Sequence, residues 1–427
     1  MQVITDLQLH SRFSRAVSPQ MTIPFIAQWV AKKGIGLVAT GDWTHPMWFR
    51  EIQTNLEEMG NGLLKLKSQK PLFLLATEVS SIYSQGGKLR RVHTLIWVPT
   101  IAAADKINKE MTRRGCNLLA DGRPIVGLSC IQLAELVLSI EPKALLIPAH
   151  AWTPWFSVYG SLGGFDSLDE AFGPFAKNIY AVETGLSSNP AMNWRIAELD
   201  HRSIVSFSDA HSGPKLGREA TVFDLPKISY EEIYQAIRTQ KGIAYTIEFY
   251  PEEGKYHYSG HRNCGIRWSP QDSKQKGTTC PVCGKPLTQG VMQRVEELAS
   301  RSEEDLRLAK KDNMTISRAF PQRPPFVMLV PLQEIIAEAI GSPVGSPKIV
   351  PLFDRLVTDL GGEFAVLLTV PISEIARVAG SRIAEGIEKV RTGDIVIEPG
   401  YDGLFGVVKI WAEGTGKDAS KEQLSMF

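Results

Sequence analysis

Residues 3–10, which read VITDLQLH, contain the pattern that decides the fold. A short run of β-branched and apolar residues ends in the polar side chains Gln8 and His10, and an amphipathic stretch follows at Ile23–Val30. Strands that alternate with helices in this way favour a parallel α/β sheet. The predicted strands are Val3–Leu9, Gly36–Thr40, Leu72–Thr77, Val92–Val98, Ala144–Pro148, Ile179–Glu183 and Ser203–Ser208. Seven such strands predict a closed barrel of the (β/α)7 type.

The chain has 427 residues, which is too long for one ordinary core. Its composition is that of a globular protein, with 43% hydrophobic and 22% charged residues. We expect a barrel at 1–250, a zinc-binding module at 251–290, a mainly helical DNA-binding domain at 291–412 and a flexible tail at 413–427. No long apolar run or export signal is apparent, so we expect a cytoplasmic, nucleoid-associated protein without membrane contact. The net charge of +1 excludes a uniformly basic DNA-coating protein.

The third region has its own expected order of elements. A charged helix is predicted at Arg294–Lys311, a proline-rich link at Pro321–Pro325, and a long helix at Ile372–Val390. Two further helices are predicted at Leu332–Ile340 and Val350–Leu360, and a β stretch at Ile395–Trp411.

Potential metal ligands follow almost every predicted strand of the first region. They are Asp6, Gln8, His10, Asp42, His45, Glu78, His93, His150, Glu183, Asp209 and His211. The carboxyl ends of barrel strands converge on one face, so these side chains are expected to meet there. A single residue of this kind is usually a cap or a satisfied polar group, but that explanation does not account for so many successive strand ends. Imidazole and carboxylate together suit Zn²⁺, Mn²⁺ or iron.

The motifs around these residues resemble those of the polymerase-and-histidinol-phosphatase (PHP) family. The motifs are DLQLHSRFS (6–14), GDWTHP (41–46), ATEVS (76–80), VHTLIW (92–97), PAHAW (148–152) and FSDAHS (207–212). The resemblance implies a distorted seven-stranded barrel that hydrolyses phosphoesters with two or three metal ions.

Specific ligand roles follow from this resemblance. His10, Glu78 and Asp209 would hold one metal, and these three are our candidate catalytic residues. Glu78 would bridge to a second metal, held also by His93 and His150. The remaining ligands, around a third ion, would be Asp42, His45 and His211.

Gln8 departs from the family pattern, which usually has histidine at this position. A glutamine carbonyl is a poorer ligand for zinc than imidazole but can coordinate a hard ion. Either the first site is altered or it prefers Mg²⁺ or Mn²⁺. A barrel that has lost its chemistry is a further alternative.

A second cluster has the spacing of a structural zinc site, His261-x2-Cys264-x15-Cys280-x2-Cys283. His257 is a rival for the histidine position. Four protein ligands leave no open coordination position, so this site is expected to be structural. Segment 261–290 also carries five basic residues against Asp272, which suggests contact with a phosphate backbone. A solvated surface on a structural clip would explain the same charges.

The barrel and zinc module together resemble the endonuclease Q branch of the PHP family over nearly the whole chain. The longest similar stretches are GHRNCGIRWSP (260–270), CPVCGKPLTQGVMQRVEELA (280–299), PPFVMLVPLQEIIAEAIG (324–341) and EIARVAGSRIAEGIEKVRTGDIVIEPGYDG (374–403). This resemblance implies metal-dependent incision of double-stranded DNA on the 5′ side of uracil, hypoxanthine, xanthine or an abasic site. The alternatives are a small-molecule phosphatase and a DNA-binding accessory protein.

Two further groups of residues are candidates for contact with partners. The aromatic and basic side chains suited to an extruded base or to DNA are Trp152, Trp155, Phe156, Arg262, Arg267 and Tyr401. Core or loop packing is the more common explanation for each of the aromatic ones. Residues 423–427 (QLSMF) resemble the peptide that bacterial sliding clamps bind, through Gln423, Leu424, Met426 and Phe427. The alternative is that this five-residue similarity arises by chance and that the tail binds no partner.

Overall fold

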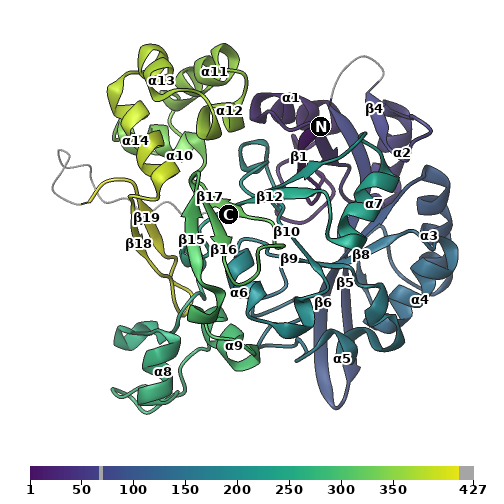
Figure 1. Cartoon of the computed structure of the whole chain (residues 1–427). Coiled ribbons are helices and arrows are strands. Elements are labelled where there is room, and N and C mark those ends of the chain that lie inside the picture. The colour runs from purple at the N-terminus through teal and green to yellow at the C-terminus, as the bar shows by residue number, and fades with distance from the viewer. Residues whose placement is uncertain (67–70, 413–427) are drawn as a thin grey trace.

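The computed structural model describes residues 1–66 and 71–412, and its architecture is a mixed α/β fold built on one large sheet (Figure 1). Ten strands of this sheet follow one another in the order β15-β16-β17-β12-β11-β1-β2-β5-β4-β3. In addition, β6 and β7 pair with β5, and β8 pairs with β6. The helices that follow residue 331 form a separate group at the upper left of Figure 1. Among the described residues, no helix is both long and apolar enough to cross a bilayer.

Three parallel strands form the centre of the N-terminal half, namely β1 (Gln2–Asp6), β2 (Leu37–Ala39) and β5 (Leu72–Gln85). The helix α1 (Ile23–Lys33) connects the first two strands. It ends at Gly34, whose φ of 81° is a left-handed conformation that glycine adopts without strain. The structure confirms the predicted positions of all seven strands of this half.

The strand directions differ from the expected parallel barrel. β6 (Lys88–Val98) runs antiparallel to β5, and β8 (Leu145–Pro148) runs antiparallel to β6. Gly86 and Gly87 form the two-residue turn between β5 and β6, and both have positive φ, as a tight hairpin requires. Such a turn leaves no room for the crossover helix that a parallel pair needs.

The strand ladder is also interrupted. β9 (Ala181–Glu183) and β10 (Ser203–Val205) form a separate parallel pair rather than joining the large sheet. Beyond β10, the amides of Ser206 and Ser208 donate to the side chains of Thr221 and Asp6, at 3.0 and 3.1 Å. Side-chain acceptors, rather than a neighbouring strand, thus bind the backbone amides beyond β10. The strands of the described residues therefore do not pair into the closed barrel that was expected.

The other side of the sheet extends into the C-terminal half. β11 (Ala220–Asp224) and β12 (Ile243–Glu248) continue the sheet from β1 in antiparallel order. β17 (Phe326–Met328) then adds parallel to β12, and β16 (Met314–Ser317) and β15 (Leu308–Lys311) complete this edge.

One prediction for this region is wrong, whereas the proline-rich link at 321–325 is confirmed, because these residues lie in no helix or strand. The charged helix expected at Arg294–Lys311 is helical only within α9 (Val291–Leu298), and β15 occupies its C-terminal end. Residues 321–325 lead directly into β17, whose pairing with β12 joins the two halves of the chain. Charge pattern alone did not reveal that these short strands have a partner elsewhere in the chain.

The upper-left group in Figure 1 is helical, as predicted. It comprises α10 (Leu332–Ala339), α11 (Ile349–Asp359), α12 (Glu363–Leu368), α13 (Ile372–Ala379) and α14 (Ser381–Thr392). The long helix expected at Ile372–Val390 is divided at Gly380, whose φ of 88° is incompatible with a continuous helix.

A small zinc-ligand segment and a β ribbon lie below this group. The segment contains β13 (Ser259–His261), β14 (Ile266–Trp268) and α8 (Pro270–Lys276), and the ribbon contains β18 (Val396–Glu398) and β19 (Val407–Lys409). The remaining elements are β3 (Leu56–Glu58), β4 (Leu64–Leu66), β7 (Ile125–Val126), α2 (Pro46–Asn55), α3 (Ile101–Arg113), α4 (Cys130–Ile140), α5 (Leu168–Phe172), α6 (Pro190–Trp194) and α7 (Tyr230–Thr239).

A buried ion pair joins the helical group to the rest of the fold. Lys33 at the end of α1 contacts Glu363 at the start of α12, with 2.6 Å between Nζ and Oε2, and both side chains are almost fully buried. Lys33 also donates to the carbonyl of Pro214, and Glu363 accepts from the amide of Leu332. Each charge is therefore compensated by its partner and by a further hydrogen bond.

We predict that Lys33→Met lowers the free energy of unfolding by about 3–5 kcal/mol, because Glu363 would remain as an uncompensated buried charge. Urea denaturation followed by circular dichroism measures this change. The matched control is Lys32→Met, because Lys32 pairs with Asp354 on the surface at 2.6 Å and such a pair contributes about 0–1 kcal/mol. Equal effects of the two substitutions would contradict the prediction.

Candidate metal centre

Potential metal ligands converge where the predicted strands of the N-terminal half end. The ligands fall into two groups, His10, Asp209 and His211 in the first and Glu78, His93 and His150 in the second. Within each group, the ligand atoms all lie within 4.8 Å of one another. Residues that are about two hundred positions apart in the chain thus share one pocket.

Glu78 on β5 belongs to the second group and also contacts the first. Its Oε2 is 3.3 Å from Nε2 of His10, which is in turn 3.1 Å from Oδ1 of Asp209. Its Oε1 is 3.4 Å from Nε2 of His150 and also contacts Nδ1 of His93. One carboxylate therefore has one oxygen facing each group, which is the geometry of a ligand shared between two cations.

The donor set fits divalent cations. Four buried atoms of this pocket, Oε1 of Gln8, Nε2 of His10, Oε1 of Glu78 and Oδ1 of Asp209, have no hydrogen-bond partner among the described residues. Buried polar atoms are normally satisfied, so a group of unsatisfied ones indicates a missing ion or water. Nitrogen and carboxylate donors together suit Zn²⁺, Mn²⁺ or iron.

Gln8 is part of this pocket although it replaces the expected histidine. Its Nε2 donates to Oε2 of Glu78 at 2.7 Å, which leaves the carbonyl oxygen Oε1 buried and unpartnered. Gln8 is thus placed to orient Glu78 and to offer one oxygen to a hard cation.

Asp42 binds His10 and two serines rather than facing either group of ligands. Its Oδ1 lies 2.9 Å from Nδ1 of His10, and its Oδ2 accepts hydrogen bonds from Ser11 and Ser14. A carboxylate that holds the second nitrogen of a ligand histidine fixes the orientation of the ring. Asp42 therefore lies where it would support a ligand, rather than in either group of three.

His45 lies outside both groups. It caps α2, where its Nδ1 accepts from the amide of Trp48 at 3.5 Å, and its ring stacks on Phe13 at 4.5 Å. Only His211 of the three residues expected around a third ion belongs to a group, and it joins His10 and Asp209.

The protonation states of His93 and Glu78 favour metal binding. Burial lowers the pKa of His93 to about 4 despite the adjacent Glu78. Burial alone would raise the pKa of Glu78, but His93 and Arg123 hold it well below its usual range. At neutral pH, His93 is therefore neutral and Glu78 is charged, which are the forms that coordinate cations.

The backbone is strained at this pocket. Asp42, His150 and Asp209 have φ values of 43°, 30° and 47°, in the left-handed region that non-glycine residues rarely adopt. Such conformations cost energy and persist at functional sites where the surroundings enforce them. Two of the three residues are potential ligands and the third supports His10.

Arg123 is a member of the pocket that the sequence analysis missed. Its guanidinium lies 3.7 Å from Oε1 of Glu78 and adds a positive charge beside the ligand groups. Arg123 precedes β7, whose two residues pair with Ser80 and Ser81 of β5. This two-residue pairing has no recognisable sequence pattern, so nothing distinguished Arg123 from other arginines.

The second cluster has the geometry of a four-ligand metal site. The ligand atoms of His261, Cys264, Cys280 and Cys283 all lie within 4.8 Å of one another, and His257 does not belong to the group. Burial would raise the pKa of Cys280, but the backbone amides of Cys283 and Val282 lower it to about 6. A thiolate supported by backbone amides is typical of a metal-binding knuckle.

Comparisons with known proteins agree over most of the chain. Residues 331–394 match the family described as the MJ0043 C-terminal domain. The protein MJ0043 of Methanocaldococcus jannaschii is 33% identical over 267 residues, which span 61% of this chain and 31% of its own length. YqxK of Bacillus subtilis is 29% identical over 390 residues, which span 88% of this chain and 89% of YqxK.

Two solved structures are similar over the full fold. The lesion-specific endonuclease PfuEndoQ of Pyrococcus furiosus has 32% identity and a TM-score of 0.82, covering 96% of this chain and 95% of its own. An endonuclease Q in complex with a 27-mer duplex that carries an abasic lesion at the active site has 33% identity and a TM-score of 0.81, covering 97% and 98%. This chain belongs to the endonuclease Q family.

In this endonuclease Q family member, Trp152 does not reach the surface. Its ring is buried, stacks on Tyr159 at 4.7 Å, and donates from Nε1 to Asn193 at 2.8 Å. The expectation that Trp152 contacts DNA is therefore wrong, because the side chain is buried and Tyr159 and Asn193 already occupy one face and the polar edge of the indole.

The next two aromatic residues lie beside the ligands. Phe156, which has a φ of 61°, packs on His93 with 4.8 Å between ring centroids. Trp155 meets Tyr256 edge to face at 5.0 Å. Phe156 therefore contacts a potential ligand, and Trp155 contacts a residue that precedes the zinc-ligand segment.

The other predicted DNA contacts come together although they are far apart in the sequence. Arg267 donates to the carbonyl of Pro399 and lies 5.9 Å from the ring of Tyr401. The amide of Arg262 donates to Asp402 at 2.7 Å. Tyr401 packs directly on Gly260, where a β-carbon would collide with its ring, so it anchors the ribbon to the segment.

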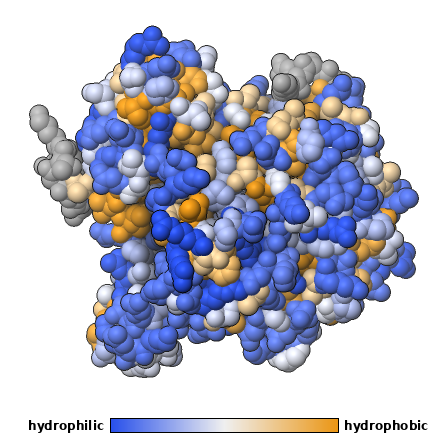
Figure 2. Space-filling view, in the orientation of Figure 1, coloured by the Kyte–Doolittle hydropathy of each residue, from blue (hydrophilic) through white to orange (hydrophobic). Residues whose placement is uncertain are grey.

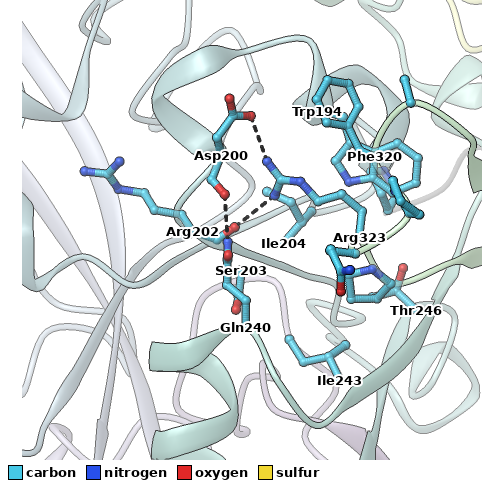
Figure 3. A pocket seen from close by; sticks show the side chains of 15 residues that line it. Trp194, Asp200, Arg202, Ser203, Ile204, Gln240, Ile243, Thr246, Phe320 and Arg323 are labelled. Carbon is cyan, nitrogen blue, oxygen red and sulfur yellow. Dashed lines mark hydrogen bonds and ion pairs between the residues drawn. The ribbon is translucent and has the colours of Figure 1, made fainter.

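The pocket in Figure 3 contains none of the metal ligands. Its volume is about 340 Å³, and Trp194, Ile204, Ile243 and Phe320 give it an apolar lining. Arg323 donates to Oδ1 of Asp200 at 3.0 Å, and Arg301 pairs with the same carboxylate. The predicted clamp-binding residues, by contrast, lie outside the described part of the chain.

We predict that Asp42→Asn weakens metal binding at the first group by about 10- to 100-fold, because the amide no longer fixes His10 through a charged hydrogen bond. Competition with a fluorescent chelator measures this affinity. The control is Asp105→Asn, since Asp105 pairs only with Lys109 on the surface of α3. An unchanged affinity in Asp42→Asn would show that Asp42 does not support a ligand.

Proposed function

We propose that this protein is a metal-dependent DNA repair endonuclease that hydrolyses the phosphodiester on the 5′ side of a deaminated base or an abasic site. The observation that carries the proposal is Glu78, with one oxygen towards each group of ligands. The similarity to a lesion-specific endonuclease and to a complex with an abasic duplex supports the choice of substrate. The inference that deaminated bases are substrates rests on the sequence motifs described above.

Each residue of the pocket has a role in this proposal. Two divalent cations at such a site, Mg²⁺, Mn²⁺ or Zn²⁺, would activate a water and neutralise charge on the reacting phosphate. Glu78 would hold both ions, while His10 and Asp209 complete one site and His93 and His150 the other. Arg123 balances the negative charge of Glu78 and lies within reach of a phosphate bound in the same pocket.

The zinc-ligand segment would have a structural role in DNA binding. Its four ligands leave no coordination position for substrate, and Arg262 and Arg267 are exposed beside them. Cationic side chains on a small rigid module are suited to phosphate contacts on duplex DNA.

A bacterial-type sliding clamp is the proposed protein partner. The proposal rests on the sequence QLSMF at 423–427, in which Leu424, Met426 and Phe427 are apolar. Apolar side chains in a short polar-flanked segment suit the groove of a partner protein. Recruitment by a clamp would place the nuclease on newly copied DNA.

For the nuclease activity, we predict that the protein cuts a labelled duplex that carries one uracil, hypoxanthine or abasic site in the presence of Mg²⁺ or Mn²⁺. Glu78→Gln is expected to reduce the cutting rate by about 100- to 1,000-fold, because ligation by Glu78 supports several kcal/mol of charge stabilisation. Glu57→Gln on the exposed face of β3 is the control.

Denaturing electrophoresis of the products locates the cut. Incision 5′ of the lesion by the parent and by Glu57→Gln is the expected result. An intact strand under every metal would contradict the proposed function, as would equal cutting by Glu78→Gln. Release of phosphate from histidinol phosphate or nucleotides without DNA cutting would favour a small-molecule phosphatase instead.

For the clamp, we predict that deletion of residues 423–427 reduces co-elution with a bacterial sliding clamp by at least about tenfold, since the apolar residues supply most of the contact area. Ser425→Ala is the control, because Ser425 is not one of the apolar anchors. Binding that survives the deletion would reject this partner site.

A further inference from the structure

The turn of the β18–β19 ribbon exposes two large apolar side chains in succession. Leu404 and Phe405 are 38% and 39% exposed. Figure 1 shows the ribbon running from the helical group towards α9, with this turn at its lower end. In Figure 2, an apolar area lies over the ribbon. Adjacent exposed apolar residues at a turn indicate an interaction site more often than scattered ones do.

The turn is held rigidly against the zinc-ligand segment and the chain before it. Asp402 accepts from the amide of Arg262 and from the hydroxyl of Thr288. The amide of Gly403 donates to the carbonyl of Lys255 at 3.0 Å. Gly406 lies so close to the backbone carbonyl of Glu252 that a β-carbon would collide with it. These contacts fix the direction in which the apolar tip projects.

Intermediate contacts link the turn to the metal pocket. The hydroxyl of Tyr256 is 3.7 Å from the position that a β-carbon on Gly403 would take. Tyr256 meets Trp155 at 5.0 Å, and the next residue, Phe156, packs on the ligand His93 at 4.8 Å. A short series of ring contacts thus connects the tip to the second group of ligands.

Three cationic side chains lie around the tip, against the carboxylates of Asp402 in the turn and Glu398 at the end of β18. Nζ of Lys255 lies 4.3 Å from the centroid of the Phe405 ring, and Arg262 and Arg267 are exposed nearby. Burial raises the pKa of Glu253, whose carbonyl accepts from Gly406, to about 8, so this carboxyl carries little charge at neutral pH. An apolar tip surrounded by cations complements a stack of bases flanked by phosphates.

We propose that Leu404 and Phe405 form an apolar wedge that enters duplex DNA beside the lesion and fills the space left when the damaged nucleotide leaves the stack. This inference rests on the proposed function. Apolar wedges that separate base steps are a general means of unstacking DNA, and a base that undergoes inspection must leave the helix. The cationic side chains Lys255, Arg262 and Arg267 beside the tip favour duplex DNA as the occupant.

The first test measures unstacking without cleavage. In a Glu78→Gln background, 2-aminopurine beside a uracil in a duplex reports base opening by its fluorescence. We expect binding to raise the fluorescence several-fold, and the further double substitution Leu404→Ser and Phe405→Ser to abolish this rise at saturating protein. Val396→Ser is the matched control, because Val396 is 38% exposed on the same ribbon and pairs with Lys409, away from the turn. An equal rise in the double variant overturns the wedge.

The second test separates unstacking from the cutting chemistry. With Glu78 intact, the double variant should cut the lesion in a paired duplex about 10- to 100-fold more slowly than the parent. It should cut the same lesion in an unpaired bubble, where the base is already unstacked, within about twofold of the parent. Equal losses on both substrates, or no loss on either, overturn the wedge. Failure of the parent on both substrates would instead count against the proposed nuclease.

Zinc content and the thermal midpoint of the double variant serve as folding controls. Both should equal those of the parent, because Leu404 and Phe405 are exposed and contribute little to the core.

Discussion

The burial of one carboxylate, Glu78, determines which neighbouring side chains the rest of the pocket must supply. Its two oxygens face separate groups of imidazole and carboxylate side chains, and those groups come from strands far apart in sequence. A charged carboxylate is costly to bury, so the surrounding histidines, Gln8 and Arg123 are needed to compensate it even before a cation binds. The strained backbone at His150 and Asp209 is consistent with this requirement, because strain persists where other contacts enforce it.

Glu78 itself depends on an unusual feature of the sheet. The β5–β6 hairpin is longer than its neighbouring strands, and it places Glu78 and His93 on adjacent antiparallel strands. Since antiparallel strands need only a tight turn, the two ligands are fixed by backbone hydrogen bonds rather than by a flexible loop. Rigid strands hold side chains more precisely than loops do, which suits a site with several cations.

The C-terminal half contributes structure as well as charge. β17 continues the sheet through β12, and Lys33 and Glu363 join the helical group to α1. The zinc-ligand segment in turn anchors the ribbon that carries Leu404 and Phe405. The parts that would contact DNA are therefore connected to the metal pocket by backbone hydrogen bonds and buried contacts.

The sequence by itself determined the positions of the strands, the identity of most potential ligands and the three cysteines of the second cluster, while the structure decided between His261 and His257. The sequence could do so because these features depend on local patterns: an apolar run followed by a polar residue, or paired ligands at fixed spacing. Only the tertiary structure decided the antiparallel hairpin, the supporting position of Asp42, the presence of Arg123 beside Glu78 and the burial of Trp152. These depend on which segments pair across long separations in the chain, and a local pattern carries no information about a partner two hundred residues away.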